Sequence, residues 1–165
     1  MLTGSLAAAY YATPRATQDI DVVIEASLEQ LSNLVQKLTE AGLYVSVEAA
    51  HEASRLEGQF NAIDPETGWK ADFIIRKDRP FSASEFERRR TASVLGLDLS
   101  LASAEDLIIA KLEWAKKGGS ELQLRDVQAI LRSQLDHLDQ SYIEHWAEEL
   151  ELAELWKRVQ QDVSS

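Results

Sequence analysis

The chain has 165 residues, 45% of them apolar, which suits one domain with a sizeable core. Its 28 acidic and 17 basic residues give a formal net charge of −11, which excludes general duplex DNA binding because such binding needs a clustered cationic face. The chain has no cysteine, which excludes disulfides and thiolate catalysis, and its three histidines have no HExxH spacing, so no zinc site is expected.

Membrane association is also not expected. No stretch reaches the roughly 18 apolar residues that a membrane span needs. The apolar first 12 residues lack the cationic segment that begins a secretory signal. We therefore expect a cytoplasmic protein that does not contact membranes.

Hydrophobic spacing and helix caps divide the first part of the chain into helices and strands. An Ala-rich stretch favours a helix that Pro14 ends, and acidic residues alternate with β-branched ones in the strand that follows. Ser27 is an N-cap for the next helix, and Gly42 ends it. The expected elements are a helix over 4–11, a strand over 19–24, a helix over 28–41, and a strand with the inner face Leu43, Val45 and Val47.

The remainder is expected to contain four strands and then only helices, after a stretch over 48–58 that fits neither pattern. The strands cover 59–63, 70–76, 92–95 and 97–101, with a hairpin turn over 64–68 and a helix from Ser84, as cap, through Arg90. The helices cover 104–117, 121–135, 140–151 and 152–161. The fold class is therefore α/β (α+β), with a core over 1–117 and a C-terminal helical region over 118–165 packed on it.

Asp19 and Asp21 are the first candidates for a functional site. Aspartate is depleted in strands, and the period of two places both carboxylates on one face, about 6.5–7 Å apart. These like charges repel, and Mg²⁺, which binds carboxylate oxygens and substrate phosphates, would stabilise them. The alternative is an exposed outer strand face, where alternating polar residues are common.

Two further features extend this candidate site. Asp72 is embedded in the strand over 70–76, and if that strand lies beside 19–24, three carboxylates could hold two metal ions. The alternative for Asp72 is a charge at a strand edge. Gly4 and Ser5 begin the first helix, whose free N–H groups suit a phosphate, but such a pair is also an ordinary helix cap.

Together these residues resemble the nucleotidyltransferase superfamily. The closest resemblance, over residues 1 to about 130, is to the small bacterial AbiEii-like toxins and related uncharacterised nucleotidyltransferase-like families. Only three residues precede Gly4, where members usually have a helix and a fuller first strand. The matching segments are Gly4-Ser5, Pro14-Arg15-Ala16-Thr17, Asp19-Ile20-Asp21, the strand residue Asp72, and Ser103-Ala104-Glu105-Asp106-Leu107 followed by Ala110-Lys111.

The resemblance implies a mixed β-sheet flanked by helices, with a C-terminal helical region. It also implies Mg²⁺-dependent transfer of a nucleoside monophosphate from an NTP such as ATP to an acceptor hydroxyl. Gly4 and Ser5 would bind the triphosphate. Asp19, Asp21 and Asp72 would bind two Mg²⁺ ions, with Mn²⁺ as the other candidate, and Asp72 would accept the proton of the attacking hydroxyl.

Lys111 and Arg15 are candidate nucleotide-binding cations. At 100° per residue Lys111 lies in the middle of an apolar helix face that includes Trp114, opposite a face with Ile109 and Glu113. A lysine there either reaches the triphosphate or extends its ammonium group to solvent. Arg15 precedes the acidic strand and either neutralises phosphate charge or is an ordinary loop arginine.

Other charged and aromatic residues have weaker claims. Arg125 and Asp126 lie off the apolar stripe of their helix and are expected to face solvent. A basic segment, Arg76, Lys77 and Arg79, is expected at the rim of the site. Arg88, Arg89 and Arg90 are read as a solvated helix end or as a patch for the acceptor, and Trp146 and Trp156 as core or dimer contacts.

One function of another class is consistent with the same sequence. A non-catalytic nucleotidyltransferase-like antitoxin or scaffold, in a toxin–antitoxin pair, would bind a partner protein through its C-terminal helices, which could also form a homodimer. The complete set of three acidic residues favours catalysis. The acidic surface and the short N-terminal segment favour the partner role.

Overall fold

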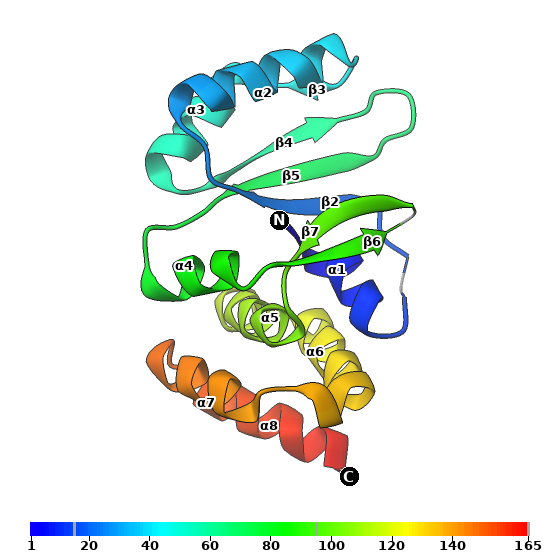
Figure 1. Ribbon diagram of the computed structural model, residues 1–165, viewed down its shortest axis with the longest axis vertical. Helices are drawn as coiled ribbons and strands as arrows, with labels where there is room; N and C mark the ends of the chain where they lie inside the picture. Colours follow the sequence, from blue (N-terminus) through cyan, green and yellow to red (C-terminus); the bar gives the residue numbers. More distant parts are fainter. Residues whose placement is uncertain (15, 95, 165) are drawn as a thin grey trace.

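A computed structural model describes residues 1–14, 16–94 and 96–164. Within these residues the strands form one seven-stranded mixed sheet in the order β3-β4-β5-β2-β1-β7-β6 (Figure 1). The strands are β1 (Leu2–Thr3), β2 (Asp19–Ile24), β3 (Tyr44–Val45), β4 (Gln59–Ile63), β5 (Lys70–Ile75), β6 (Arg90–Val94) and β7 (Leu97–Leu101). The central pair, β2 and β5, is parallel, as is β1–β7, whereas the other neighbours are antiparallel.

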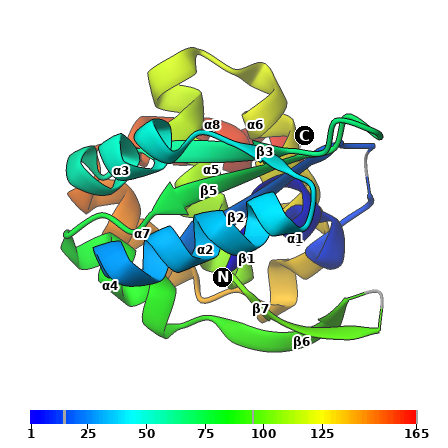
Figure 2. The same cartoon turned by 90° about the horizontal axis from the view of Figure 1, so that it is seen from above.

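The helices lie on both sides of this sheet. They are α1 (Gly4–Tyr11), α2 (Leu28–Glu40), α3 (Val47–Leu56), α4 (Pro80–Glu87), α5 (Ala104–Gly118), α6 (Glu121–Gln134), α7 (Gln140–Glu149) and α8 (Ala153–Ser164), with a short 3-10 turn over Leu135–His137. In Figure 1 α2 and α3 lie above β4 and β5, and α5 to α8 lie below. Figure 2, seen from above, shows α2 running across the sheet. None of the helices in the described ranges combines the length and apolarity needed to cross a membrane.

The alternation of β5 gives each face of the sheet its own environment. Phe73 stacks on Phe60 of β4, with ring centroids 5.1 Å apart, in a core under α2 and α3 that also contains Leu31 and Val35. Asp72 points to the opposite face, towards α5, because successive strand side chains alternate. A larger second core joins α1 and α4 to the helices α5 to α8 and includes Trp156, which is a core residue rather than a surface contact.

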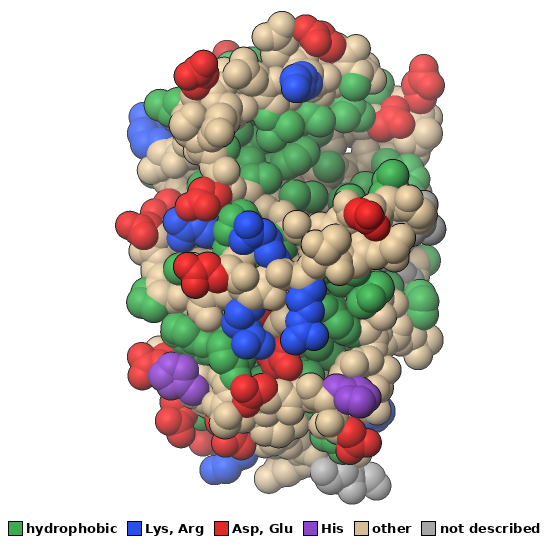
Figure 3. Space-filling view, in the orientation of Figure 1, with side chains coloured by type: hydrophobic (Ala, Val, Ile, Leu, Met, Phe, Trp, Pro, Cys, Tyr) green, Lys and Arg blue, Asp and Glu red, His purple; other side chains and the backbone are tan. Residues whose placement is uncertain are grey.

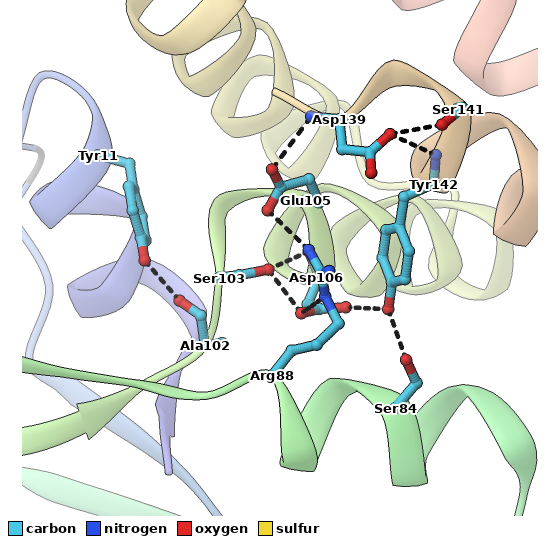
Figure 4. Close-up of polar contacts among 10 residues, drawn as sticks. All are labelled: Tyr11, Ser84, Arg88, Ala102, Ser103, Glu105, Asp106, Asp139, Ser141 and Tyr142. Carbon is cyan, nitrogen blue, oxygen red and sulfur yellow. Dashed lines mark hydrogen bonds and ion pairs between the residues drawn. The ribbon is translucent and has the colours of Figure 1, made fainter. Parts of the chain in front are cut away.

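A buried polar network attaches α4 and α7 to the start of α5 (Figure 4). Asp106 is fully buried and accepts hydrogen bonds from the hydroxyl of Ser103, the N-cap of α5, and from Tyr142 of α7, at 2.7 Å. Arg88, just after α4, forms ion pairs with Asp106 at 3.3 Å and Glu105 at 3.2 Å and lies over the Tyr142 ring. Arg88 is therefore held by this network and is not a freely solvated side chain at a helix end, whereas a role of Arg88, Arg89 and Arg90 in acceptor binding stays a prediction.

Most predicted elements are present, and the exceptions have identifiable causes. Val47 starts α3 instead of ending a strand, because the Ser46 hydroxyl caps the helix by accepting from the Ala49 N–H at 3.1 Å. This helix fills most of the stretch left undecided. Helix α4 starts at Pro80, a favourable first position, so Ser84 lies inside it and contacts the Tyr142 hydroxyl.

The burial of α5 differs from the prediction at two positions. Helix α5 is buried around most of its circumference, so Ile109 is fully buried, whereas Trp114, expected in the core, is 51% exposed. Leu95 and Arg15 lie outside the described residues. The division at residue 117 stays a prediction.

We expect Arg88→Met to lower the free energy of unfolding by about 2 kcal/mol, because Glu105 and Asp106 would remain buried without their cation. Arg89→Met is the matched control, since Arg89 is exposed and contacts only local groups of α4 in the described structure. Chemical denaturation of both variants measures the difference. Equal stability of the two would show that the network contributes little to the attachment of α7.

Candidate active site

The parallel pairing of β2 and β5 places Asp21 directly beside Asp72. The register pairs Asp21 with Asp72 and Asp19 with Lys70, all on the face that points towards α5. The condition set for Asp72 in the sequence analysis, a strand next to 19–24, is therefore met. Two carboxylates on neighbouring strands, whose backbones are about 4.8 Å apart, form the acidic centre of the site.

The backbone of Gly4 lies close to Asp21, at a distance that leaves no room for a side chain on residue 4. Strand β1 pairs Thr3 with Asp21, and α1 starts at the next residue. Gly4 has φ +65°, and a Cβ built on it would lie 1.8 Å from Asp21 Oδ2, so only glycine fits here. The backbone N–H of Ser5 donates a hydrogen bond to the Asp21 carboxylate. The predicted Gly-Ser pair and the predicted acidic strand therefore meet at one point.

The surroundings of Asp21 make its negative charge costly. Burial raises the pKa of Asp21, and the nearby charge of Asp72 raises it further. Lys111 and the Ser5 N–H oppose this shift. A second cation placed at the pair would relieve the same repulsion, which is the electrostatic condition for a metal site.

Lys70 is a member of this constellation that the sequence analysis missed. Its ammonium group lies 3.0 Å from Asp72 and 3.4 Å from Asp19, and the hydrogen bond to Asp72 raises the pKa of Lys70. The signal was present in the sequence, since Lys70 precedes Asp72 by two residues and so shares its strand face. Asp19 is the exposed member of the three carboxylates, with 53% of its side chain accessible.

Lys111 lies on α5 opposite the acidic pair. Its side chain is 4% exposed, so it does not extend to solvent, and it donates to Asp126 Oδ2 at 2.7 Å and to Gln123 Oε1 at 3.0 Å. Asp126 was expected to face solvent, but its side chain is only 11% exposed because α6 packs closely along α5. Arg125 is exposed, as expected.

These side chains line one pocket of about 220 Å³ between the sheet and α5. Five of the seven predicted site residues line it. The full lining is Thr3, Gly4, Ser5, Asp21, Gln59, Asp72, Ile74, Ala110, Lys111, Trp114 and Gln123. Asp19 lies beyond the lining, and Arg15 lies outside the described residues. Trp114 was missed because its helical position indicated the core.

The carboxylates of the site have the right chemistry for a divalent cation, but their positions match a metal site less well. Asp21 and Asp72 supply the carboxylate oxygens that Mg²⁺ or Mn²⁺ prefers. In the described ranges, however, no three His, Asp or Glu side chains are grouped closely enough to hold a metal ion. Asp21 and Asp72 are the fitting pair because they are neighbours in register and both line the pocket. Lys70 contacts Asp72 and Asp19, and a role for Asp19 stays a prediction.

Comparison with solved structures identifies the fold. A crystal structure of an antigenic nucleotidyltransferase-like protein from Paracoccidioides brasiliensis aligns over 99% of this chain and 81% of its own, with a TM-score of 0.57 and 19% identity. The chain has a nucleotidyltransferase-like fold. The antibiotic-resistance factor ANT(2'')-Ia, in a solution structure, aligns over 99% of this chain and 84% of its own, with a TM-score of 0.56 and 14% identity.

At these identities the likeness concerns the fold alone. No protein-family model matches the sequence, and a search of curated proteins finds no match. The nucleotidyltransferase-like fold inferred from the sequence is therefore confirmed at the level of architecture, whereas the roles of individual residues stay predictions.

Substituting Gly4 tests whether its contact with Asp21 shapes the site. Both Gly4→Ala and Gly68→Ala place a side chain at positive φ, but nothing lies within 4 Å of a Cβ at Gly68. We expect Gly68→Ala to lose about 1 kcal/mol of unfolding free energy and Gly4→Ala about 3 kcal/mol, because Asp21 must also move. Thermal and chemical denaturation measure both. Equal losses would contradict a close Gly4–Asp21 contact.

We expect Lys111→Met to lower the free energy of unfolding by about 3 kcal/mol, because Asp126 would be left buried without its partner. Lys111→Met/Asp126→Asn should recover part of this loss, since the unpaired charge is removed. Denaturation of the two single variants and the double variant gives the coupling energy. Additive effects of the two substitutions would show that the ion pair does not hold Lys111 in place.

Proposed function

We propose that this protein is a Mg²⁺-dependent nucleotidyltransferase, which transfers a nucleoside monophosphate from an NTP to an acceptor hydroxyl. The observation that carries the proposal is the Asp21–Asp72 pair, in register on parallel strands and in one pocket with Gly4, Ser5 and Lys111. The nucleotidyltransferase-like fold supports it.

The chain's own residues divide the work of this reaction. Ser5, at the N-terminus of α1, and Lys111 would bind and orient the triphosphate. The acceptor oxygen attacks the α-phosphorus, a new O–P bond forms, and the bond to the bridging oxygen breaks, which releases pyrophosphate. Asp72 accepts the hydroxyl proton. Positioning and charge neutralisation suffice for such a displacement, so no cysteine or histidine nucleophile is needed.

Metal ions complete the proposed site. Mg²⁺ held by Asp21 and Asp72, with Asp19 as a further ligand once Lys70 moves away, would neutralise the developing charge on the phosphates. Lys111 and Ala110 form the wall of the pocket on the α5 side, opposite the pair. Arg15, four residues before the acidic strand, is a further cation proposed to neutralise phosphate.

Membership of the AbiEii-like toxin group and a cytoplasmic toxin–antitoxin role belong to this proposal. They rest on the sequence segments around Gly4, Asp19 and Ser103. The non-catalytic alternative, a scaffold or antitoxin that binds a partner through its C-terminal helices, draws on a different observation. Lys70 already contacts two of the three carboxylates and offsets part of their charge, as a built-in cation would in a protein that binds no metal.

Label transfer from α-³²P NTPs in the presence of Mg²⁺ and cell extract tests the catalytic proposal. We expect the wild type to label an acceptor, and Asp21→Asn and Asp72→Asn to reduce the rate by at least about a hundredfold, because each removes a central charge of the site. Asp98→Asn is the control, since Asp98 is exposed on β7, outside the pocket.

Binding of Mn²⁺ by isothermal titration provides a readout that does not depend on the acceptor. Wild type and Asp98→Asn should bind the ion, whereas Asp21→Asn and Asp72→Asn should not. Label transfer that persists without Asp21 would overturn the site assignment. A folded wild type that binds neither Mn²⁺ nor NTP would favour the scaffold function.

A further inference from the structure

A second pocket, of about 210 Å³, adjoins the candidate active site. It lies between the ends of β4 and β5, helix α4 and the outer end of α5. The two pockets share the lining residues Thr3, Gln59, Ile74, Ala110 and Trp114. The two pockets are therefore direct neighbours, with Trp114 bordering both.

The second pocket gathers positive charge on an otherwise acidic protein. Figure 3 shows several Lys and Arg side chains across the middle of one face, with Asp and Glu side chains among them. Four cations line the pocket, and they are Arg76, Lys77, Arg79 and Lys117. This set includes the basic segment that the sequence analysis placed at the rim of the site.

The acidic residues of this pocket do not balance these cations. Glu113 binds Arg79 through two hydrogen bonds, at 2.7 and 2.6 Å, and also pairs with Lys117 at 3.5 Å. Glu57 accepts a hydrogen bond from the Asp78 N–H. Burial raises the pKa of Glu85 to about 8, so this carboxyl is mostly neutral at pH 7. Arg76 is itself paired with Glu25, at 2.6 Å, although Glu25 does not line the pocket. Three carboxylates therefore lie beside the four cations, which leaves one positive charge in excess.

Lys77 carries the excess positive charge, although the more distant charge of Glu113 acts on it. It forms no ion pair with a carboxylate anywhere in the described ranges, although it is half-buried. Burial lowers the pKa of Lys77, and the charges of Lys117 and Arg79 lower it further. Like charges held together in a hollow favour an anion that binds between them.

The spacing between the two pockets suits a substrate that occupies both. Arg76 directly follows β5 and lies four residues after Asp72, or about 13 Å along the extended chain. Along α5, Lys111 and Lys117 are six residues apart, or about 9 Å. Trp114 lies between them and is half exposed. The second pocket therefore lies roughly 9 to 13 Å from the acidic pair, a distance that a small molecule can span.

We propose that this pocket binds an anionic group, a phosphate or carboxylate, of the acceptor whose hydroxyl reacts at Asp72. This inference rests on the proposed function, and it names the substrate class as a small anionic acceptor. Lysine and arginine are the side chains that bind such groups. The donor triphosphate is assigned to Gly4, Ser5 and Lys111, which do not line this pocket.

Titration of the full chain with inorganic phosphate, followed by amide NMR shifts, tests the proposal. The test variant is Lys77→Gln/Lys117→Gln. Its control is Lys37→Gln/Lys157→Gln, which changes the net charge equally at two exposed lysines outside both pockets. We expect the Kd for phosphate to rise at least about tenfold in the test variant and to stay within about twofold in the control. Melting curves verify that both variants are folded.

A parallel titration with Mg²⁺ and ATP separates the acceptor from the donor. If the pocket belongs to the acceptor, ATP binds the test variant as tightly as the wild type. Loss of ATP affinity in that variant would assign the pocket to the donor and overturn the inference, as would equal phosphate binding in the two double variants. Failure of the proposed function would be recognised by a different result. Asp21→Asn would then retain label transfer, whether or not phosphate binds to the second pocket.

Discussion

The parallel register of β2 and β5 is the constraint on which the rest of the site depends. It places the Asp21 and Asp72 carboxylates side by side. Their negative charges repel each other, and groups on the surrounding elements have to compensate this repulsion. The compensation comes from three directions: the start of α1 through Ser5, the neighbouring position on β5 through Lys70, and the opposite helix through Lys111. A shift of one residue in either strand would turn one carboxylate to the α2–α3 core, so the register decides whether both carboxylates reach the pocket.

The C-terminal helices contribute to this site without lining most of it. Lys111 is held by Asp126 of α6, and the start of α5 is fixed by Asp106 together with Tyr142 of α7. Both contacts are ion pairs or hydrogen bonds in places where water is largely excluded, so a displaced helix leaves a buried charge unpaired. The position of the Lys111 ammonium group therefore depends on correct packing of α6, and the helical region supports the side of the pocket opposite Asp21 and Asp72.

Local patterns were sufficient to predict what neighbouring residues determine, and they failed where tertiary packing decides. The alternation in Asp19–Ile24 and the cap at Ser27 were correctly predicted because strand period and capping are properties of a few adjacent residues. Strand periodicity could also have identified Lys70, because it shares a strand face with Asp72. The Lys111–Asp126 pair could not be predicted in this way, because it depends on how α6 packs on α5. Trp114 was misplaced for a related reason: α5 is buried on most sides, so its periodicity does not distinguish the pocket from the core.

The net charge of −11 has a different meaning for a large ligand and for a small one. At physiological ionic strength charges are screened over about 8 Å, so an anion within a pocket responds mainly to the side chains that line it. Lys77 and its neighbours then determine the local potential, and the acidic helices further away contribute little. A duplex extends well beyond that distance, and most of its phosphates would meet the acidic surface. The same charge distribution that excludes broad nucleic-acid binding is therefore compatible with a small anionic acceptor placed beside two carboxylates and the cations that offset them.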